Sequence, residues 1–232
     1  MAMDHEVLRV DFTKLVALFP LPDCVLLPHT TIPLHIFEAR YRSMANDSLD
    51  SSGLIAMASF RGTSLAEQAE DHPPLRPYVC VGHIVKHQRL DDGRYHILLQ
   101  GVCRARIVKE IDDRPYRQAI LEPAETDITM EIDLEDHRQR IDGLLGDRLL
   151  KSLKSVNVIH NWLSREVPTT AVIDLAIMML CDDFEQRYEM LAETDVIRRA
   201  KWLNRLLLDL HQTLVIADRM GTGETADGIQ LN

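Results

Sequence analysis

Prolines interrupt the apolar stretch at residues 18–44, and they limit what this chain can fold into more than any other feature. Each proline removes a backbone hydrogen-bond donor, so proline is disfavoured in the middle of a sheet. The four in this stretch are Pro20, Pro22, Pro28 and Pro33. We therefore expect short strands at sheet edges, separated by bends, and we exclude one long central strand.

The pattern changes from strand to helix after Pro33. Apolar residues then recur at helical spacing, at Ile36, Phe37, Tyr41 and Met44. Glu38 and Arg42 stand four residues apart, which is the favourable orientation for an ion pair along a helix. The sequence thus predicts a strand that leads into a short amphipathic helix with a Glu38–Arg42 pair on its surface.

A β-hairpin is predicted further along, where Asp92-Gly93 separates two β-rich runs at residues 78–90 and 95–108. Asp-Gly between apolar runs is a strong hairpin signal. With these two residues as the turn, one face of the hairpin is expected in the core; it carries Cys80, Ile84, Leu90, Tyr95, Ile97, Leu99, Cys103 and Ile107. The other face is half apolar, with His83, Val85, His87 and Arg89 opposite His96, Leu98, Gln100, Val102, Arg104 and Arg106.

This mixed face raises two possibilities of ligand binding. His87 and His96 would be diagonal neighbours, but no cysteine or carboxylate shares their face to complete a zinc site, so we expect no metal and no cofactor. Residues 81–109 also hold six Lys and Arg against two Asp. The patch His87, Arg89, His96, Arg104 and Arg106 is therefore a candidate for RNA or an acidic partner, although Tyr95 is the one aromatic residue there that could stack on a base.

The remaining patterns divide the chain into a β-rich part and a helical part. Residues 53–60 predict a buried strand, 63–77 a surface loop, and 118–122 a last strand that ends at Pro123. A helical stripe follows at Leu134, Ile141, Leu144, Leu145, Leu149 and Leu153, and a buried helix is expected over 171–184 with Thr170 as its N-cap. We expect an α+β fold with a β domain at 1–125 and a helical subdomain at 126–218.

The last helix is expected to begin after Thr194 or Asp195 and to carry a coiled-coil-like seam. Its apolar residues alternate spacings of four and three, at Val196, Ala200, Leu203, Leu207, Leu210, Leu214 and Ala217. The seam fits packing against the helices of the same subunit, and it also fits a homo-oligomer formed through residues 195–218. The tail at 219–232 is expected to be disordered.

Composition favours a soluble cytoplasmic protein. No apolar run approaches the roughly 20 residues that span a bilayer, and the N-terminus lacks the features of a signal peptide. Four cysteines without a CxxC pair, Cys24, Cys80, Cys103 and Cys181, indicate reduced thiols. The net charge of −10 repels phosphate backbones, so nucleic-acid binding would need a local exception such as the basic hairpin.

Three blocks together resemble the N-terminal substrate-binding domain of the ATP-dependent Lon protease. They are Leu18-Phe19-Pro20-Leu21 with Pro33-Leu34-His35-Ile36-Phe37-Glu38-Ala39-Arg40-Tyr41, then the hairpin at 92–101, and then YEMLAETDV at 188–196. The resemblance implies a PUA-like β pseudo-barrel followed by a helical C-terminal subdomain. It departs from the family at His29, where glycine is commoner, and at Ala39, where proline is commoner, so the turn and the helix start are expected to differ in detail.

The resemblance implies a non-enzymatic module, a stand-alone member of the family that binds unfolded polypeptide or a protein partner in a context related to proteolysis. Phe37, Arg40 and Tyr41 are the candidate peptide-binding residues, because they would border a groove beside an edge strand. The plainer interpretation places Phe37 and Tyr41 in the core. RNA binding by the PUA-like hairpin is the alternative function.

Catalysis is not expected. The chain contains no GxxxxGK[ST] motif for nucleotide phosphates. Ser152 and Ser155 neighbour Lys151 and Lys154, but on an amphipathic helix, where a solvated surface explains them better than a catalytic dyad.

Overall fold

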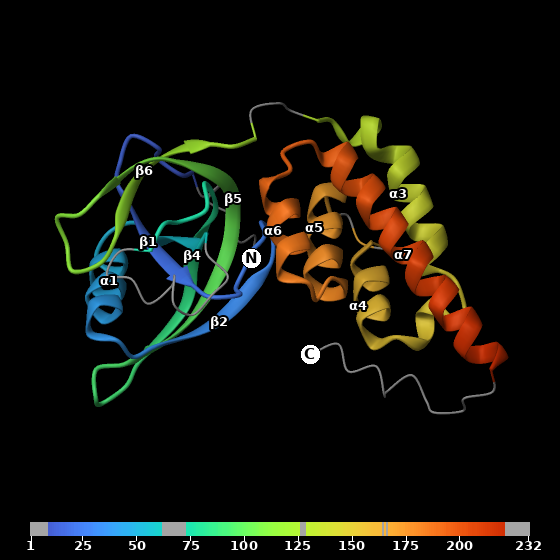
Figure 1. The fold of residues 1–232 in the computed structure, drawn as a ribbon, viewed down its shortest axis with the longest axis horizontal. Coiled ribbons are helices and arrows are strands. Elements are labelled where there is room, and N and C mark those ends of the chain that lie inside the picture. The colour runs from blue at the N-terminus through green and yellow to red at the C-terminus, as the bar shows by residue number, and fades with distance from the viewer. Residues whose placement is uncertain (1–8, 62–72, 126–128, 164, 166, 221–232) are drawn as a thin grey trace, which may run out of the picture. The chain divides into compact units, whose positions relative to one another are not determined.

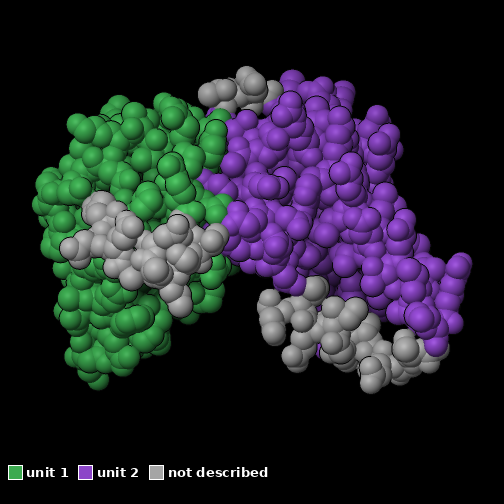
Figure 2. Space-filling view, in the orientation of Figure 1, with its two compact units in different colours: residues 1–124 green, residues 125–232 purple. Residues whose placement is uncertain are grey.

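The computed structural model describes residues 9–61, 73–125, 129–163, 165 and 167–220. These form two compact units, Met1–Ala124 and Glu125–Asn232 (Figure 2), and each is considered by itself. Most of the expected loop at 63–77 and nearly all of the expected tail at 219–232 lie outside the described residues.

In its described residues, unit 1 is a closed β structure with one short helix (Figure 1). Strand β5 pairs with β4 on one edge and with both β2 and β6 on the other, so five strands, β5–β4–β3–β1–β6, form a ring to which β2 is attached. The elements are β1 (Val16–Leu21), β2 (Thr31–Ile36), α1 (Ala39–Leu49), β3 (Leu54–Ser59), β4 (Tyr78–Arg89), β5 (Tyr95–Ile111) and β6 (Gln118–Pro123). With the helices of unit 2, this confirms the α+β class.

The prolines occupy positions where a lost donor costs little, but not only at sheet edges. Pro33 lies in the edge strand β2 as expected. Pro20 lies in β1, which runs between β3 and β6, so the prediction was wrong for this strand. Leu18 donates its N–H to Arg117 O on the β6 side, at 2.8 Å, and β6 pairs with β1 only at Val16 and Ala17. The nitrogen of Pro20 points to the same side beyond that pairing, where no ladder hydrogen bond is lost.

The hairpin exists, but its predicted register is wrong by at least one residue. Gly93 has a φ of +79° and donates to Leu90 O at 2.9 Å, while Leu90 donates to Arg94 O at 2.9 Å. This is a three-residue turn that ends in a left-handed glycine, a common alternative to the two-residue turn. This turn places His96 opposite Gln88, and His87 opposite Ile97, and further shifts occur beyond them at Ile84/Lys86 and Val81/Gly82.

The core of unit 1 depends on close backbone approach as well as on apolar side chains. Strand β3 is buried along its whole length, as predicted. Gly101 lies so near the preceding loop that a Cβ there would be 2.1 Å from the backbone oxygen of Leu27. His29 adopts φ +64°, the left-handed conformation that glycine tolerates best, and donates its N–H to Gly101 O at 2.9 Å. His29 therefore takes a backbone conformation that suits glycine better.

Unit 2 is helical, and the start of one of its helices is capped by a side chain from another helix. Its elements are α3 (Glu131–Leu145), the 3-10 turn η1 (Leu150–Ser152), α4 (Lys154–Leu163), α5 (Thr169–Leu180), α6 (Phe184–Ala192) and α7 (Val196–Arg219). The Glu131 carboxylate accepts from Thr169 N at 2.8 Å and from Thr169 Oγ1 at 2.7 Å, so it caps α5 from another helix. The prediction of a Thr170 cap and one helix over 171–184 is wrong, because α5 starts earlier and a separate helix, α6, begins at Phe184.

The last helix begins where the sequence predicts. Asp195 accepts from the backbone N–H groups of Ile197 at 2.8 Å and Arg198 at 3.3 Å, as an N-cap does. The first half of the seam is buried at Val196, Ala200, Leu203 and Leu207, and α7 packs against α3 and α5 (Figure 1). The seam is thus used, at least in part, inside one subunit; self-association through it stays a prediction.

Candidate functional site: the edge of strand β2

The three residues predicted to bind peptide lie at the β2–α1 junction, and they differ in exposure. Phe37 is 60% exposed, and Arg40 is also on the surface. Tyr41 is buried with its ring edge-to-face against Phe19, at a centroid distance of 4.7 Å, and burial raises its pKa. The Arg40 guanidinium lies over the Tyr41 ring, 4.5 Å from its centroid. The exposed surface at this junction is therefore made by Phe37 and Arg40, while Tyr41 supports it from the core.

The expected Glu38–Arg42 ion pair is replaced by other contacts. Glu38 is the N-cap of α1 with extended backbone angles, and its carbonyl oxygen accepts from Arg42 N at 2.9 Å, but its side chain does not pair with that of Arg42. Its carboxylate pairs instead with Arg40, with Nη2 at 2.9 Å from Oε2. Arg42 Nη1 donates to Asp92 O at 3.2 Å and thereby joins α1 to the hairpin turn.

Strand β2 has a free edge within the part of the chain that the structure describes, where it pairs with β5 alone. Gly101 donates to Thr30 O at 2.8 Å, so alternate residues from Thr30 direct their backbone groups to β5. The residues between them, Thr31, Pro33 and His35, direct their backbone groups to the free edge. Since Pro33 has no N–H, this edge offers two donors, from Thr31 and His35, and three carbonyl acceptors.

Beside this edge lies a surface that we call the β2 patch: Pro33, His35, Phe37, His96 and Leu98. Pro33 lies opposite Leu98, and His35 opposite His96, so the four share one face of the sheet. The ring of Phe37 is 5.8 Å from that of His35, centroid to centroid, and the His35 ring is 4.9 Å from that of His96. The patch is thus a row of exposed or half-exposed apolar and aromatic side chains next to unpaired backbone groups.

The basic hairpin residues do not form one exposed surface. Arg104 is buried at 2% exposure, so the expectation that it faces outward with His87 and Arg89 is wrong. Arg106 is exposed but held by Glu122, with Nε and Nη2 each 2.6 Å from Oε1. His87 and His96 are exposed but lie on opposite faces of the sheet, because His87 pairs with Ile97 and His96 with Gln88, so they are not the diagonal neighbours that were predicted. The geometry therefore gives no support to the RNA alternative.

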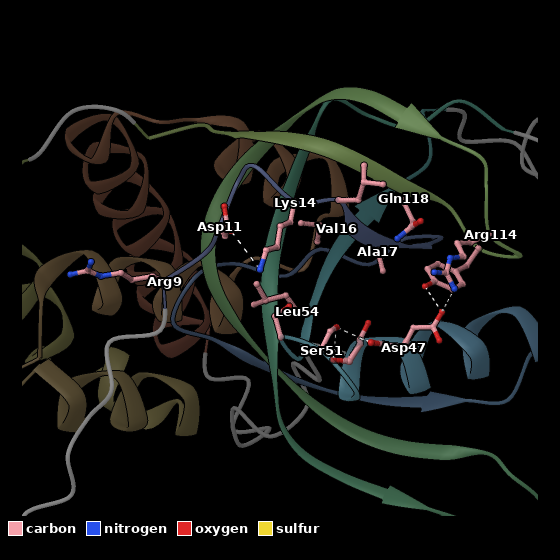
Figure 3. Close-up of a pocket in the computed structure, with 14 residues that line it drawn as sticks. Arg9, Asp11, Lys14, Val16, Ala17, Asp47, Ser51, Leu54, Arg114 and Gln118 are labelled. Carbon is pink, nitrogen blue, oxygen red and sulfur yellow. Dashed lines mark hydrogen bonds and ion pairs between the residues drawn. The ribbon is translucent and has the colours of Figure 1, made fainter.

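Unit 1 also contains a polar hollow of about 550 Å³, shown in Figure 3. The segment at 9–17, the end of α1 and the start of β6 meet there. Asp47 Oδ2 accepts from Tyr116 Oη at 2.7 Å and from Arg114 Nη1 at 3.2 Å. Burial, followed by the hydrogen bond to Asp47, raises the pKa of Tyr116 to about 12. These carboxylate contacts are internal pairs, so the hollow does not present a concentrated charge to a ligand.

Other chemistry has little support in the described ranges. No group of three or more His, Cys, Asp and Glu side chains there is arranged to hold a metal ion, and none of the four cysteines forms a disulfide. No described helix has the length and apolar character of a membrane span.

Sequence reasoning missed His35, Tyr116 and the free edge of β2. The alternation of exposed Pro33, His35 and Phe37 with buried Leu34 and Ile36 was a usable strand signal, but it was assigned in part to a helix. The Tyr116–Asp47 contact joins residues far apart in the sequence and carried no local signal.

Comparison with known families identifies one domain over most of the chain. The sequence model of one protein family, the ATP-dependent protease La (LON) substrate-binding domain, matches residues 16–209. A Lon protease of Desulfosudis oleivorans is 26% identical over 214 residues, which cover 88% of this chain and 25% of that protein. Lon protease 2 of Bdellovibrio bacteriovorus is 24% identical over 98% of this chain and 28% of its own length. The chain thus spans about a quarter of the length of these relatives.

Solved structures show the same fold. The N-terminal domain of a Lon protease from the Mycobacterium avium complex has a TM-score of 0.63 and 17% identity, covering 84% of this chain and 99% of that one. A Lon N-terminal domain protein from Xanthomonas campestris has a TM-score of 0.56 and 23% identity, covering 82% and 96%.

Proposed function

Because the chain belongs to the LON substrate-binding domain family, we propose that it is a non-enzymatic recognition module that binds unfolded polypeptide, or a partner's extended segment, at the β2 edge. The match concerns the substrate-binding domain, and the matched relatives are longer proteins called Lon protease. The observation that carries the proposal is Phe37, which is 60% exposed beside a strand edge with unpaired backbone groups.

The chemistry of this edge suits sequence-tolerant binding. An extended segment would receive hydrogen bonds from Thr31 and His35 and donate to the carbonyl groups between them, which requires no particular side chain. Phe37 and Leu98 would add apolar contact area, at roughly 25 cal/mol per Å² removed from water. Pro33 interrupts the row of donors, so the added strand pairs over a short length, and edge-to-edge aggregation of the protein itself is discouraged.

The proposal is tested by fluorescence anisotropy with a labelled, permanently unfolded protein, such as a reduced and alkylated one. We expect Phe37→Ser to weaken binding at least fivefold, because it removes the exposed ring without opening a cavity. Ile132→Ser is the matched control: Ile132 is 80% exposed on α3 in unit 2, and its loss should leave affinity within a factor of two.

A salt series separates this function from RNA binding. Apolar contacts and neutral backbone hydrogen bonds give an affinity that changes little with ionic strength, whereas phosphate recognition declines steeply. Equal affinity of the Phe37→Ser and Ile132→Ser variants, or binding of a structured RNA in place of the unfolded protein, would refute the proposal.

A further inference from the structure

The strongest unassigned feature outside the proposed backbone contacts is the histidine pair on the β2 patch. His35 and His96 lie directly opposite each other on β2 and β5, and both are exposed. Their ring centroids are 4.9 Å apart, with the ring planes at 68°. We propose that His35 and His96 form a two-histidine site for a late divalent transition-metal ion, namely zinc, nickel or copper(II).

The separation of the rings fits a shared ion. Two imidazoles on one tetrahedral zinc have centroids roughly 5 Å apart, since each metal–nitrogen bond is ~2.0–2.1 Å and the ring centre lies about 1.2 Å beyond the nitrogen. The observed 4.9 Å therefore needs rotation of the rings about their side-chain bonds at most, and no movement of the strands. Neutral imidazole is also a preferred ligand of these three ions.

The surroundings determine how strong such a site can be. Gln88 lies opposite His96 on β4, on the side away from His35, so its amide oxygen is placed by register as a possible weak third ligand. Water would fill the other positions of the ion, which keeps the affinity well below that of a structural zinc site. Lys86 lies opposite Leu98, one row away, and its positive charge repels a metal ion. Salt screens this repulsion.

A bound ion would join the edge strand to its neighbour. His35 is on β2, which pairs within the described part of the chain only with β5, and His96 is on β5. An ion held by both side chains adds a cross-link between these strands and restrains the ring of Phe37, which lies 5.8 Å from that of His35. The site stands on the histidine geometry alone, so it does not depend on the proposed polypeptide binding.

The test is calorimetric titration of the untagged full-length chain with zinc, nickel and copper(II) chlorides at neutral pH. We expect His35→Ala and His96→Ala each to weaken binding at least tenfold. His87→Ala is the matched control, because His87 is an exposed histidine of β4 that lies opposite Ile97 rather than His96, and it should change the Kd by less than twofold.

A second readout guards against misfolded variants and against metal binding to the cysteine thiols. Each ion should raise the melting temperature of the wild-type chain and of His87→Ala, but not of the His35 and His96 variants, whose circular dichroism should match the wild type. Phe37→Ser should retain the metal, which distinguishes this site from the polypeptide contact. Absence of metal binding, or binding that both His35→Ala and His96→Ala leave unchanged, would overturn the proposal.

Discussion

The two units stabilise themselves in different ways. Unit 2 buries charge: Arg199 is 2% exposed, and its guanidinium contacts Asp174, which is 1% exposed, at 3.7 Å and Glu125 at 2.8 Å. Unit 1 also buries one arginine, Arg104, but its other large buried side chains are apolar, and it relies on tight backbone approach, as at Gly101. The stability of unit 2 should therefore be sensitive to the removal of a buried charge, and that of unit 1 to added side-chain volume in its core. Because the β2 patch of unit 1 is at the surface, substitutions there should change stability little.

The largest effect is expected from Asp174→Ala in unit 2. It leaves the buried Arg199 with less compensating charge, and breaking a buried pair in this way costs about 3–5 kcal/mol. The free energy of unfolding from urea titration measures it. Asp182→Ala is the control, because the more exposed Asp182–Arg187 pair, 3.5 Å apart, should contribute about 1 kcal/mol or less. Equal losses in the two variants would show that burial of charge does not distinguish unit 2.

Adding one methyl group should have opposite signs in the two units. Gly101→Ala forces a Cβ against Leu27 O in unit 1 and is expected to destabilise by about 1–3 kcal/mol. Gly143→Ala in α3 meets nothing within 4 Å and should stabilise by about 0.5–1 kcal/mol, since alanine is the better helix former. Thermal unfolding of both variants checks the pair, and the same sign in both would contradict the comparison.

Tyr116 tests the polar contacts of unit 1 through pH. Its folded pKa of about 12 exceeds the unfolded value of about 10, so the unfolded chain ionises first, and the contribution of Tyr116 to stability is lost as pH rises from 10 towards 12. Tyr116→Phe removes the hydrogen bond to Asp47 and should cost about 1.5 kcal/mol at neutral pH. The difference in tyrosinate absorbance between wild type and variant should titrate near pH 12; a midpoint near 10 would show that the contact is not made.

The smallest expected change concerns the turn of unit 1 at His29. Its φ of +64° costs a side-chain-bearing residue energy that glycine avoids. Glycine removes this cost but gives the unfolded chain more entropy, which offsets part of the gain. His29→Gly should therefore stabilise the protein by a net amount of about 0.5–1 kcal/mol. Differential scanning calorimetry can detect the rise in melting temperature, and a fall of more than a degree or two would contradict the assigned strain.

The sequence predicted the elements better than their pairing. The strand at 53–60, the hairpin and the Asp195 cap follow from local patterns, and the structure has all three. The register did not follow, because a left-handed Gly93 and two bulges displace β4 along β5 after a turn whose sequence fits either of two lengths. The three-residue turn alone places Gln88 opposite His96, because both bulges lie further from the turn than this pair.

The candidate site was predictable only in part. The interpretation that places Phe37 and Tyr41 in the core is right for Tyr41 and wrong for Phe37, whereas the burial of Arg104 depends on packing from distant elements. The pairing of His35 with His96 depends on which edge of β5 receives β2, which no local pattern specifies.

The most direct test of the proposed function is amide hydrogen exchange of the full chain, with and without an excess of unfolded polypeptide. If an extended segment adds to the free edge, the backbone N–H groups of Thr31 and His35 should become protected, while the exposed N-terminal turn of α3 in unit 2 should exchange as before. Protection confined to unit 2 or to the turn at Asp92-Gly93, with Thr31 and His35 unchanged, would contradict the account.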